Sequence, residues 1–244
     1  MLAVDGINKS FGGLRAVADC GFTVEQGSIT ALIGPNGAGK TTAFNLISGV
    51  LKVDSGRVVF DGEEIQNLPP HQITRKGLTR TFQISRNLQG MTVLENMIVQ
   101  APVVGLMNIF RRAASAEELE RAMELLEFVG LAKLANEETR SLSYGQRKLL
   151  DFASQLMGNP KMILLDEPAG GVNPALLEEI VDRIHTLNAQ GITFLIVEHN
   201  MDLVMDISQE VVVMAFGRVL AQGTPDVIQN DPAVLSAYLG ETVL

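Results

Sequence analysis

Hydrophobic positions along this chain follow two spacings, one typical of buried strands and one typical of helices. Largely apolar runs at 29–33, 162–166 and 192–197 predict strands that are buried on both faces. Apolar residues at every third or fourth position after Ser115 predict a helix that opens with a capping box and ends at Gly130. Strands that alternate with helices indicate an α/β fold with a parallel sheet covered on both faces.

The N-terminal region shows a more local pattern. Residues 2–8, 20–25 and 56–60 predict strands, and 9–13 is the expected connection between the first two. The pair Asp61-Gly62 is expected to close the third strand in a tight turn. Because these strands are close together in the sequence, we expect a small antiparallel β lobe beside the parallel sheet.

The middle of the chain is predicted to be helical. The expected helices lie at 92–99, after Ser115, and at 143–157. We interpret the range from about 92 to 157 as a helical lobe inserted into the core of a single domain that spans residues 1–244.

The C-terminal part returns to alternating strands and helices. Asn173 and Pro174 have the residue types of an N-cap and a first helical position, so they predict a helix that continues to about Asn188. Apolar stretches on either side of Phe216-Gly217 predict a hairpin, and a short helix is expected to end the chain.

Composition narrows the class of protein. The chain has 244 residues, 46% of them hydrophobic, and a net charge of −9, which argues against nucleic acid as a partner. No apolar run approaches the ~18 residues of a membrane span, and Asp5 and Lys9 interrupt any signal-peptide core. The single cysteine, Cys20, excludes a disulfide framework or a Cys-x-x-Cys metal site, so we expect a packed apolar residue in a reducing compartment. Because the sequence shows no membrane span and no signal-peptide core, we expect a chain that is soluble by itself.

The most specific motif follows the strand at 29–33. The sequence Gly34-Pro35-Asn36-Gly37-Ala38-Gly39-Lys40-Thr41 fits G-x-x-x-x-G-K-[ST], and Thr42 continues into a predicted helix. Glycines let several backbone N–H groups converge on one anion, and the helix start adds further N–H groups. Lys40 is predicted to reach the β- and γ-phosphates of a nucleotide, and the Thr41 hydroxyl to reach Mg²⁺. A glycine-rich turn without a ligand is the alternative, against which the flanking strand and helix argue.

A pair of carboxylates ends the strand at 162–166. In Leu164-Leu165-Asp166-Glu167-Pro168, Asp166 is predicted to hold Mg²⁺ directly or through water. Glu167 is predicted to polarise the water that attacks the γ-phosphate. The alternative is that both carboxylates only cap the following helix.

These motifs, together with Leu142-Ser143-Tyr144-Gly145-Gln146, make the chain resemble the ATP-binding subunits of ABC transporters over its whole length. The family's signature is usually Leu-Ser-Gly-Gly-Gln. The resemblance implies the ABC ATPase fold: a P-loop NTPase core with a parallel sheet, a small antiparallel β lobe and a helical lobe. It also implies that two subunits close head to tail, so that Ser143, Gly145 and Gln146 of one contact the ATP held by the phosphate loop of the other.

The same resemblance gives roles to isolated residues. Gln83 lies where the family's Q-loop glutamine touches Mg²⁺ or the attacking water, and His199 where a switch histidine contacts the γ-phosphate. Phe11 lies where an aromatic residue stacks on adenine, with Val17 beside the base. From the residues alone, Gln83 would be an exposed loop residue, His199 a structural one and Phe11 part of the core.

Two positions depart from the common family pattern. Tyr144 replaces a glycine of the signature, and Asn173 replaces the usual aspartate of the D-loop, here Gly170-Gly171-Val172-Asn173. Both variants look like those of the branched-chain amino-acid import group, as do the stretches 91–96 and 237–240. Loss of the aspartate charge means that any contact of Asn173 across a dimer is a neutral hydrogen bond.

The resemblance implies an ATPase that drives an importer of branched-chain or other hydrophobic amino acids. Implied partners are integral membrane permease subunits, a second ABC ATPase subunit that is identical or paralogous, and indirectly a solute-binding protein. The implied place is the cytoplasmic face of the inner (plasma) membrane, as a peripheral subunit. ATP and Mg²⁺ are the implied substrate and cofactor.

Other functions stay open at this point. Urea or amide importers and a lipopolysaccharide exporter use similar motor subunits. Soluble ABC ATPases that act on ribosomes or DNA usually carry two ABC units or a long coiled-coil insert, which this sequence lacks. A nucleotide-binding regulator without turnover is the remaining alternative, and the Asp166-Glu167 pair and His199 argue against it.

Overall fold

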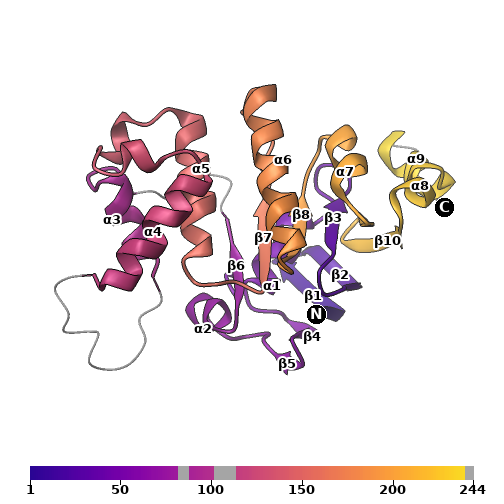
Figure 1. Cartoon of the computed structure of the whole chain (residues 1–244). Coiled ribbons are helices and arrows are strands. Elements are labelled where there is room, and N and C mark those ends of the chain that lie inside the picture. The colour runs from indigo at the N-terminus through magenta and orange to yellow at the C-terminus, as the bar shows by residue number, and fades with distance from the viewer. Residues whose placement is uncertain (82–87, 102–113, 240–244) are drawn as a thin grey trace.

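The computed structural model describes residues 1–81, 88–101 and 114–239 of the chain. Figure 1 shows a central, mainly parallel sheet, a smaller antiparallel sheet beside it, and helices that cover the rest of the central sheet. This arrangement confirms the predicted α/β fold with a small antiparallel β lobe.

The antiparallel sheet has the strand order β2-β1-β4-β5. Its strands are β1 (Leu2–Phe11), β2 (Leu14–Val24), β4 (Ser55–Phe60) and β5 (Glu63–Glu64). The predicted connection at 9–13 is wrong, because β1 continues to Phe11 and only Gly12-Gly13 forms the turn. Register shifts along the β1–β2 ladder interrupt the regular alternation of buried and exposed residues, so the pattern alone hides the extra length.

The central sheet has the strand order β10-β9-β3-β8-β7-β6. Its strands are β3 (Ile29–Ile33), β6 (Leu78–Arg80), β7 (Met162–Asp166), β8 (Thr193–Val197), β9 (Glu210–Ala215) and β10 (Arg218–Gly223). All neighbours pair in parallel except β10, which pairs with β9 as the predicted hairpin. Every residue of β3, β7 and β8 is buried, as expected for strands covered on both faces.

Alternate residues of these strands enter two different parts of the core. Leu164 and Leu195 pack in one cluster with α1 (Lys40–Ile47) and the antiparallel sheet. Ile163 and Phe194 pack in another with the helices on the opposite face. Because the central strands are parallel, their carboxyl ends lie at one edge of the sheet, where loops can bring distant side chains together.

The remaining helices are mostly those that the sequence predicts. They are α2 (Pro70–Arg75), α3 (Val93–Val99), α4 (Ala116–Phe128), α5 (Tyr144–Leu156), α6 (Pro174–Ala189), α7 (Met201–Ile207), α8 (Pro225–Gln229) and α9 (Pro232–Leu239). Ser115 and Glu118 form the predicted capping box of α4, and Asn173 caps α6. The short elements β5, α2, β6, α7 and α8 were not predicted, because two turns of helix or three residues of strand carry too little periodicity.

Helices α3, α4 and α5 lie together at one side of the molecule (Figure 1). Their apolar residues, such as Met97, Leu126 and Leu150, belong to the same buried cluster as Ile163 of β7. The helices therefore share a continuous core with the sheet.

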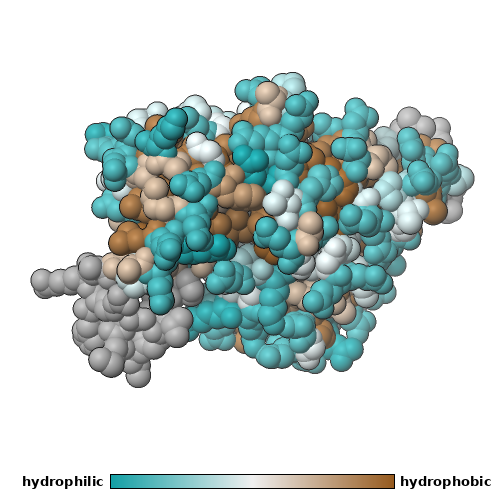
Figure 2. All heavy atoms as spheres, viewed as in Figure 1, coloured by the Kyte–Doolittle hydropathy of each residue, from teal (hydrophilic) through white to brown (hydrophobic). Residues whose placement is uncertain are grey.

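The face of the molecule that Figure 2 shows is largely hydrophilic, and hydrophobic residues are exposed in separate patches over the helices. Leu119, Val227 and Leu235 are among the exposed large apolar side chains. Within the described ranges, none of the helices combines the length and the apolar character needed to cross a bilayer.

Candidate nucleotide site

The phosphate loop connects β3 to α1 in a conformation that requires glycine. Gly34 and Gly39 both have positive φ angles, of 145° and 101°. A Cβ atom on Gly34 would lie 2.0 Å from the Met214 carbonyl oxygen, and one on Gly39 would lie 2.6 Å from that of Ala16. Side chains at these positions would therefore push the loop away from the strands that support it.

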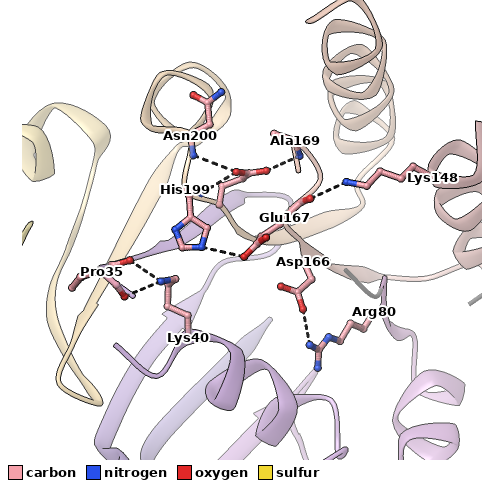
Figure 3. A network of polar contacts seen from close by, with 11 residues as sticks. Pro35, Lys40, Arg80, Lys148, Asp166, Glu167, Ala169, His199 and Asn200 are labelled. Carbon is pink, nitrogen blue, oxygen red and sulfur yellow. Dashed lines mark hydrogen bonds and ion pairs between the residues drawn. The ribbon is translucent and has the colours of Figure 1, made fainter. Parts of the chain in front are cut away.

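Lys40, the first residue of α1, folds back over this loop. Its Nζ donates hydrogen bonds to the carbonyl oxygens of Gly34, at 2.6 Å, and Pro35, at 3.1 Å (Figure 3). Burial lowers the pKa of Lys40, and the negative charge of Glu167 opposes this shift. The ammonium group is thus held at the loop where the sequence predicts phosphate binding.

A cleft of about 630 Å³ opens beside the loop, and we call it the nucleotide cleft. It is lined by Phe11, Leu14, Arg15, Ala16, Asn36, Gly37, Ala38, Gly39, Lys40, Thr41, Thr42, Glu167, His199, Phe216 and Gly217. One cleft therefore gathers the predicted aromatic residue, most of the phosphate loop, and the predicted carboxylate and histidine. Phe11 is about half exposed at the mouth, at 47%.

Of the nucleotide contacts predicted within one subunit, three lie outside this lining. Gly34 and Pro35 contribute the carbonyl groups behind Lys40 instead. The predicted contact of Val17 with the base is wrong, because its side chain is completely buried in the core between the two sheets. In a β-strand successive side chains point to opposite faces, so it is the neighbouring Ala16 that lines the cleft.

Asp166, at the end of β7, is nearly buried and bound to an arginine. Its Oδ2 accepts a hydrogen bond from Arg80 at 2.7 Å (Figure 3). Arg80 also donates to Asn45 Oδ1, at 2.7 Å, and to Ser48 Oγ, at 3.1 Å, both on or next to α1. The arginine thereby joins β6, β7 and the helix that follows the phosphate loop.

The sequence predicts Thr41 and Asp166 as the protein's oxygen ligands for a Mg²⁺ that accompanies a bound nucleotide. Such a site needs only a hydroxyl and a carboxylate from the protein, because phosphate oxygens and water complete the shell. Thr41 lines the nucleotide cleft, whereas Asp166 lies outside that lining and accepts from Arg80. Within the described residues, no cluster of three or more acidic, histidine or cysteine side chains could hold a metal by itself.

Glu167 and His199 contact each other at the carboxyl edge of the sheet. The Glu167 Oε1 and His199 Nε2 atoms lie 3.1 Å apart (Figure 3). Glu167 has a φ of 50°, an uncommon value for a residue with a Cβ atom. This backbone turns the carboxylate toward the nucleotide cleft, away from Asp166 in the preceding strand.

Glu198, which the sequence analysis did not single out, holds two loops together. Its carboxylate accepts from the backbone N–H of Ala169 at 2.6 Å, of His199 at 2.9 Å and of Asn200 at 3.3 Å. The residue is almost fully buried. The available signal was a charged residue directly after the apolar run 192–197, since buried carboxylates need hydrogen-bond donors.

The signature segment forms a second, separate cleft of about 570 Å³, the signature cleft. It is lined by Val129, Gly130, Leu131, Ser143, Tyr144, Gly145, Gln146, Leu149, Gly171, Val172, Asn173, Leu176 and Glu179. Ser143 Oγ accepts from the Gln146 N–H, and Gln146 Oε1 accepts from the Ser143 N–H, which makes a capping box for α5. No residue lines both clefts, so within the described chain the two predicted halves of the ATP site do not meet.

Asn173 has a local role in the structure. Its Oδ1 accepts from the Leu176 N–H at 2.9 Å, which caps α6. The predicted Q-loop residue Gln83 lies outside the described residues.

Comparison with known proteins identifies the family of this chain. The ABC transporter family matches residues 17–170, and the branched-chain amino acid ATP-binding cassette transporter family matches residues 218–243. The chain is 42% identical over 245 residues to the probable branched-chain amino acid transport ATP-binding protein LivG of Archaeoglobus fulgidus, covering 98% of this chain and 95% of the relative. It is also 42% identical over 251 residues to the high-affinity branched-chain amino acid transport ATP-binding protein BraF of Pseudomonas aeruginosa, covering 99% and 98%.

Solved structures give the same result at the level of the fold. The ADP conformation of MJ1267, an ATP-binding cassette of an ABC transporter, matches with a TM-score of 0.88 and 38% identity, and the match covers 99% of both chains. A dimeric structure of MJ0796, a bacterial ABC transporter cassette, matches with a TM-score of 0.78 and 26% identity, covering 92% of this chain and 99% of that one. The chain therefore belongs to the ABC transporter family, among its ATP-binding proteins.

Proposed function

We propose that this chain is the ATP-hydrolysing motor subunit of an importer for branched-chain or other hydrophobic amino acids. The names of two relatives with 42% identity support the substrate class, as does the branched-chain family match at residues 218–243. The alternatives have no comparable support: urea or amide import, lipopolysaccharide export, and a soluble ABC ATPase without a role in transport.

The separation of the nucleotide cleft from the signature cleft supports the proposal that ATP binds between two subunits. The nucleotide cleft holds the phosphate loop, Glu167 and His199, whereas the signature cleft holds Ser143 and Gly145. A head-to-tail dimer brings the nucleotide cleft of one subunit against the signature cleft of its partner. The similar cassette MJ0796 has a dimeric structure, which supports this arrangement. The partner ATPase is a second copy or a paralogue.

The chain's own residues supply most of the proposed chemistry. On binding, Lys40 exchanges the carbonyls of Gly34 and Pro35 for phosphate oxygens, and the N–H groups at the start of α1 point at the same anion. Glu167 accepts a proton from the attacking water, which is general base catalysis. His199 lies beside that carboxylate, and it contacts the γ-phosphate once ATP is bound. The partner's signature segment closes the site and excludes bulk water.

We propose that Thr41, Asp166 and the predicted Q-loop residue Gln83, which lies outside the described residues, would hold Mg²⁺. When bound, it would neutralise charge on the β- and γ-phosphates. The ion pair with Arg80 fixes the direction of the Asp166 carboxylate, so this ligand is preorganised.

A groove of about 320 Å³ is our proposed docking site for the permease. It lies where α2, β6, α3 and α5 come together, and exposed apolar Val50, Leu88 and Val99 are among its lining residues. We further propose that the range 92–157 acts as a helical lobe within a single 1–244 cassette. The subunit then sits peripherally on the cytoplasmic face of the inner membrane, where a solute-binding protein acts on it only through the permease.

Purification from the native membrane tests this function. A tagged chain from gently solubilised membranes should carry with it two permease-type proteins and a second ATPase. Reconstituted in vesicles with the solute-binding protein, the complex should accumulate labelled leucine only with ATP. ATP hydrolysis with uptake of urea but not leucine would overturn the substrate class. Recovery only with ribosomal or DNA-bound proteins would overturn the transport function.

A further inference from the structure

The loop after β7 has a backbone that needs support from its surroundings. It begins at Glu167, whose φ of 50° is uncommon for a residue other than glycine, and such backbones persist only where contacts hold them. The Glu167 N–H donates to Val197 at 2.9 Å, and the Gly170 N–H donates back to the Glu167 carbonyl at 3.0 Å. These bonds tie one side of the loop to β8 and close it into a turn.

Lys148 of α5 holds the other side of this loop. Its Nζ donates to the carbonyl oxygens of Glu167 at 3.2 Å, Pro168 at 3.2 Å and Gly170 at 2.6 Å (Figure 3 shows its contact with Glu167). An ammonium group has three N–H donors, so the loop carbonyls match its full donor capacity. The carboxylates of Glu198 and Glu167 provide negative charge close to this half-buried cation.

Tyr144 reinforces the same contact from one turn earlier on α5. Its hydroxyl donates to the Gly170 carbonyl at 3.3 Å, and a Cβ on Gly171 would lie 3.2 Å from the tyrosine ring. The Lys148 ammonium also lies 5.6 Å from the centre of that ring. Residues four apart on a helix share one face, so Tyr144 and Lys148 act on the loop together.

Helix α5 also begins at the signature segment. Ser143 is its N-cap, and Tyr144 is its first residue. The loop that carries Glu167 is therefore bonded both to β8 and to the helix that opens the signature cleft. Any displacement of α5 relative to β7 has to pull on the carbonyls of Glu167, Pro168 and Gly170.

We propose that Lys148, assisted by Tyr144, is a positioning residue for Glu167, and that it makes the hydrolysis step depend on the position of α5. The inference rests on the proposed function, because it assigns Glu167 to the hydrolysis of ATP. It explains why a bulky tyrosine stands at a signature position where glycine is common. ATP binding itself stays independent of Lys148, since the cation contacts no part of the phosphate loop within the described contacts.

Steady-state kinetics of the membrane complex test this inference. In Lys148→Met, kcat should fall at least about tenfold while KM for ATP changes less than about twofold, the pattern of a lost transition-state interaction. Lys148→Arg keeps a charged donor and should recover part of kcat. Lys133→Met removes an exposed lysine of the same region and should match the wild type. A wild-type kcat in Lys148→Met, or an equal loss of ATP binding, would overturn the inference.

A second readout reports on the position of Glu167 without turnover. The chain has three histidines, so the His199 ring can be followed by NMR. Because this ring contacts Glu167, its signals should shift in Lys148→Met and, to a smaller extent, in Tyr144→Phe. Tyr144→Phe removes only one hydroxyl, so it keeps the inference testable if Lys148→Met fails to fold. Unchanged His199 ring signals together with an unchanged kcat in Tyr144→Phe would then refute the inference. A wild-type complex that does not hydrolyse ATP would instead refute the proposed function.

Discussion

The Nε2 atom of His199 lies 3.1 Å from Oε1 of Glu167, although the two residues are 32 positions apart in the sequence. The contact follows from the parallel pairing of β7 with β8, in which Asp166 lies opposite Val197. Glu167 comes directly after the first strand, and His199 follows the second. Adjacent parallel strands thus bring the predicted base and the predicted γ-phosphate contact to one point of the nucleotide cleft.

Glu167→Gln should abolish ATP hydrolysis and retain ATP binding. The amide cannot accept the proton of the attacking water, and loss of a general base typically lowers kcat by about 10²- to 10⁴-fold. Because ATP then persists between the subunits, size-exclusion chromatography should show a dimer that depends on ATP. Glu178→Gln, on α6, is the matched control, and it should behave like the wild type. Hydrolysis at the wild-type rate in Glu167→Gln would remove this residue from its role.

Lys40→Ala should weaken ATP binding. A hydrogen bond to a charged group contributes roughly 1.5–3 kcal/mol, which corresponds to about a 10- to 150-fold loss of affinity. Fluorescence titration with a labelled ATP analogue measures the change. Lys161→Ala, which removes only an exposed ion pair with Asp61, is the control for charge. Unchanged affinity in Lys40→Ala would contradict the phosphate-loop assignment.

The sequence correctly predicted those structural elements that depend only on residues close together in the chain. The strand, glycine loop and helix at 29–47, the cap at Ser115 and the cap at Asn173 each depend on neighbouring residues, and all are found in the structure. The length of β1 was missed, because the bulges that disturb its pattern depend on its pairing with β2.

The supporting residues of the site could not be read from the sequence for a related reason. Arg80 lies in a strand of three residues, and its partner Asp166 is 86 positions away. Lys148 looks like an ordinary polar residue of an amphipathic helix until the loop after β7 folds against it. Such roles are set by tertiary contacts between segments, and single-sequence periodicity carries no information about them.

Phe11→Ala should weaken binding of ATP but not of inorganic tripolyphosphate. Stacking of a base on an aromatic ring contributes about 1–3 kcal/mol, so the loss in ATP affinity should be about 5- to 150-fold. Tripolyphosphate has no base and should bind Phe11→Ala and the wild type equally, as measured by calorimetry. Phe11→Tyr keeps the ring and should bind ATP normally. If ATP and tripolyphosphate lose affinity together, Phe11 supports the loop instead of the base.

Arg80→Met should destabilise the fold more than removal of any surface pair. Asp166 is only 8% exposed, and removal of its partner leaves an uncompensated buried charge, which typically costs about 3–5 kcal/mol. For a chain of this size the melting temperature should fall by roughly 6–20 °C in calorimetry. Arg57→Met breaks an exposed pair with Asp5 and should cost at most about 1 kcal/mol. Because the cost arises from the orphaned carboxylate, adding Asp166→Asn to Arg80→Met should recover part of the loss. If the two losses simply add, so that Asp166→Asn recovers nothing, Arg80 stabilises the fold mainly through Asn45 and Ser48.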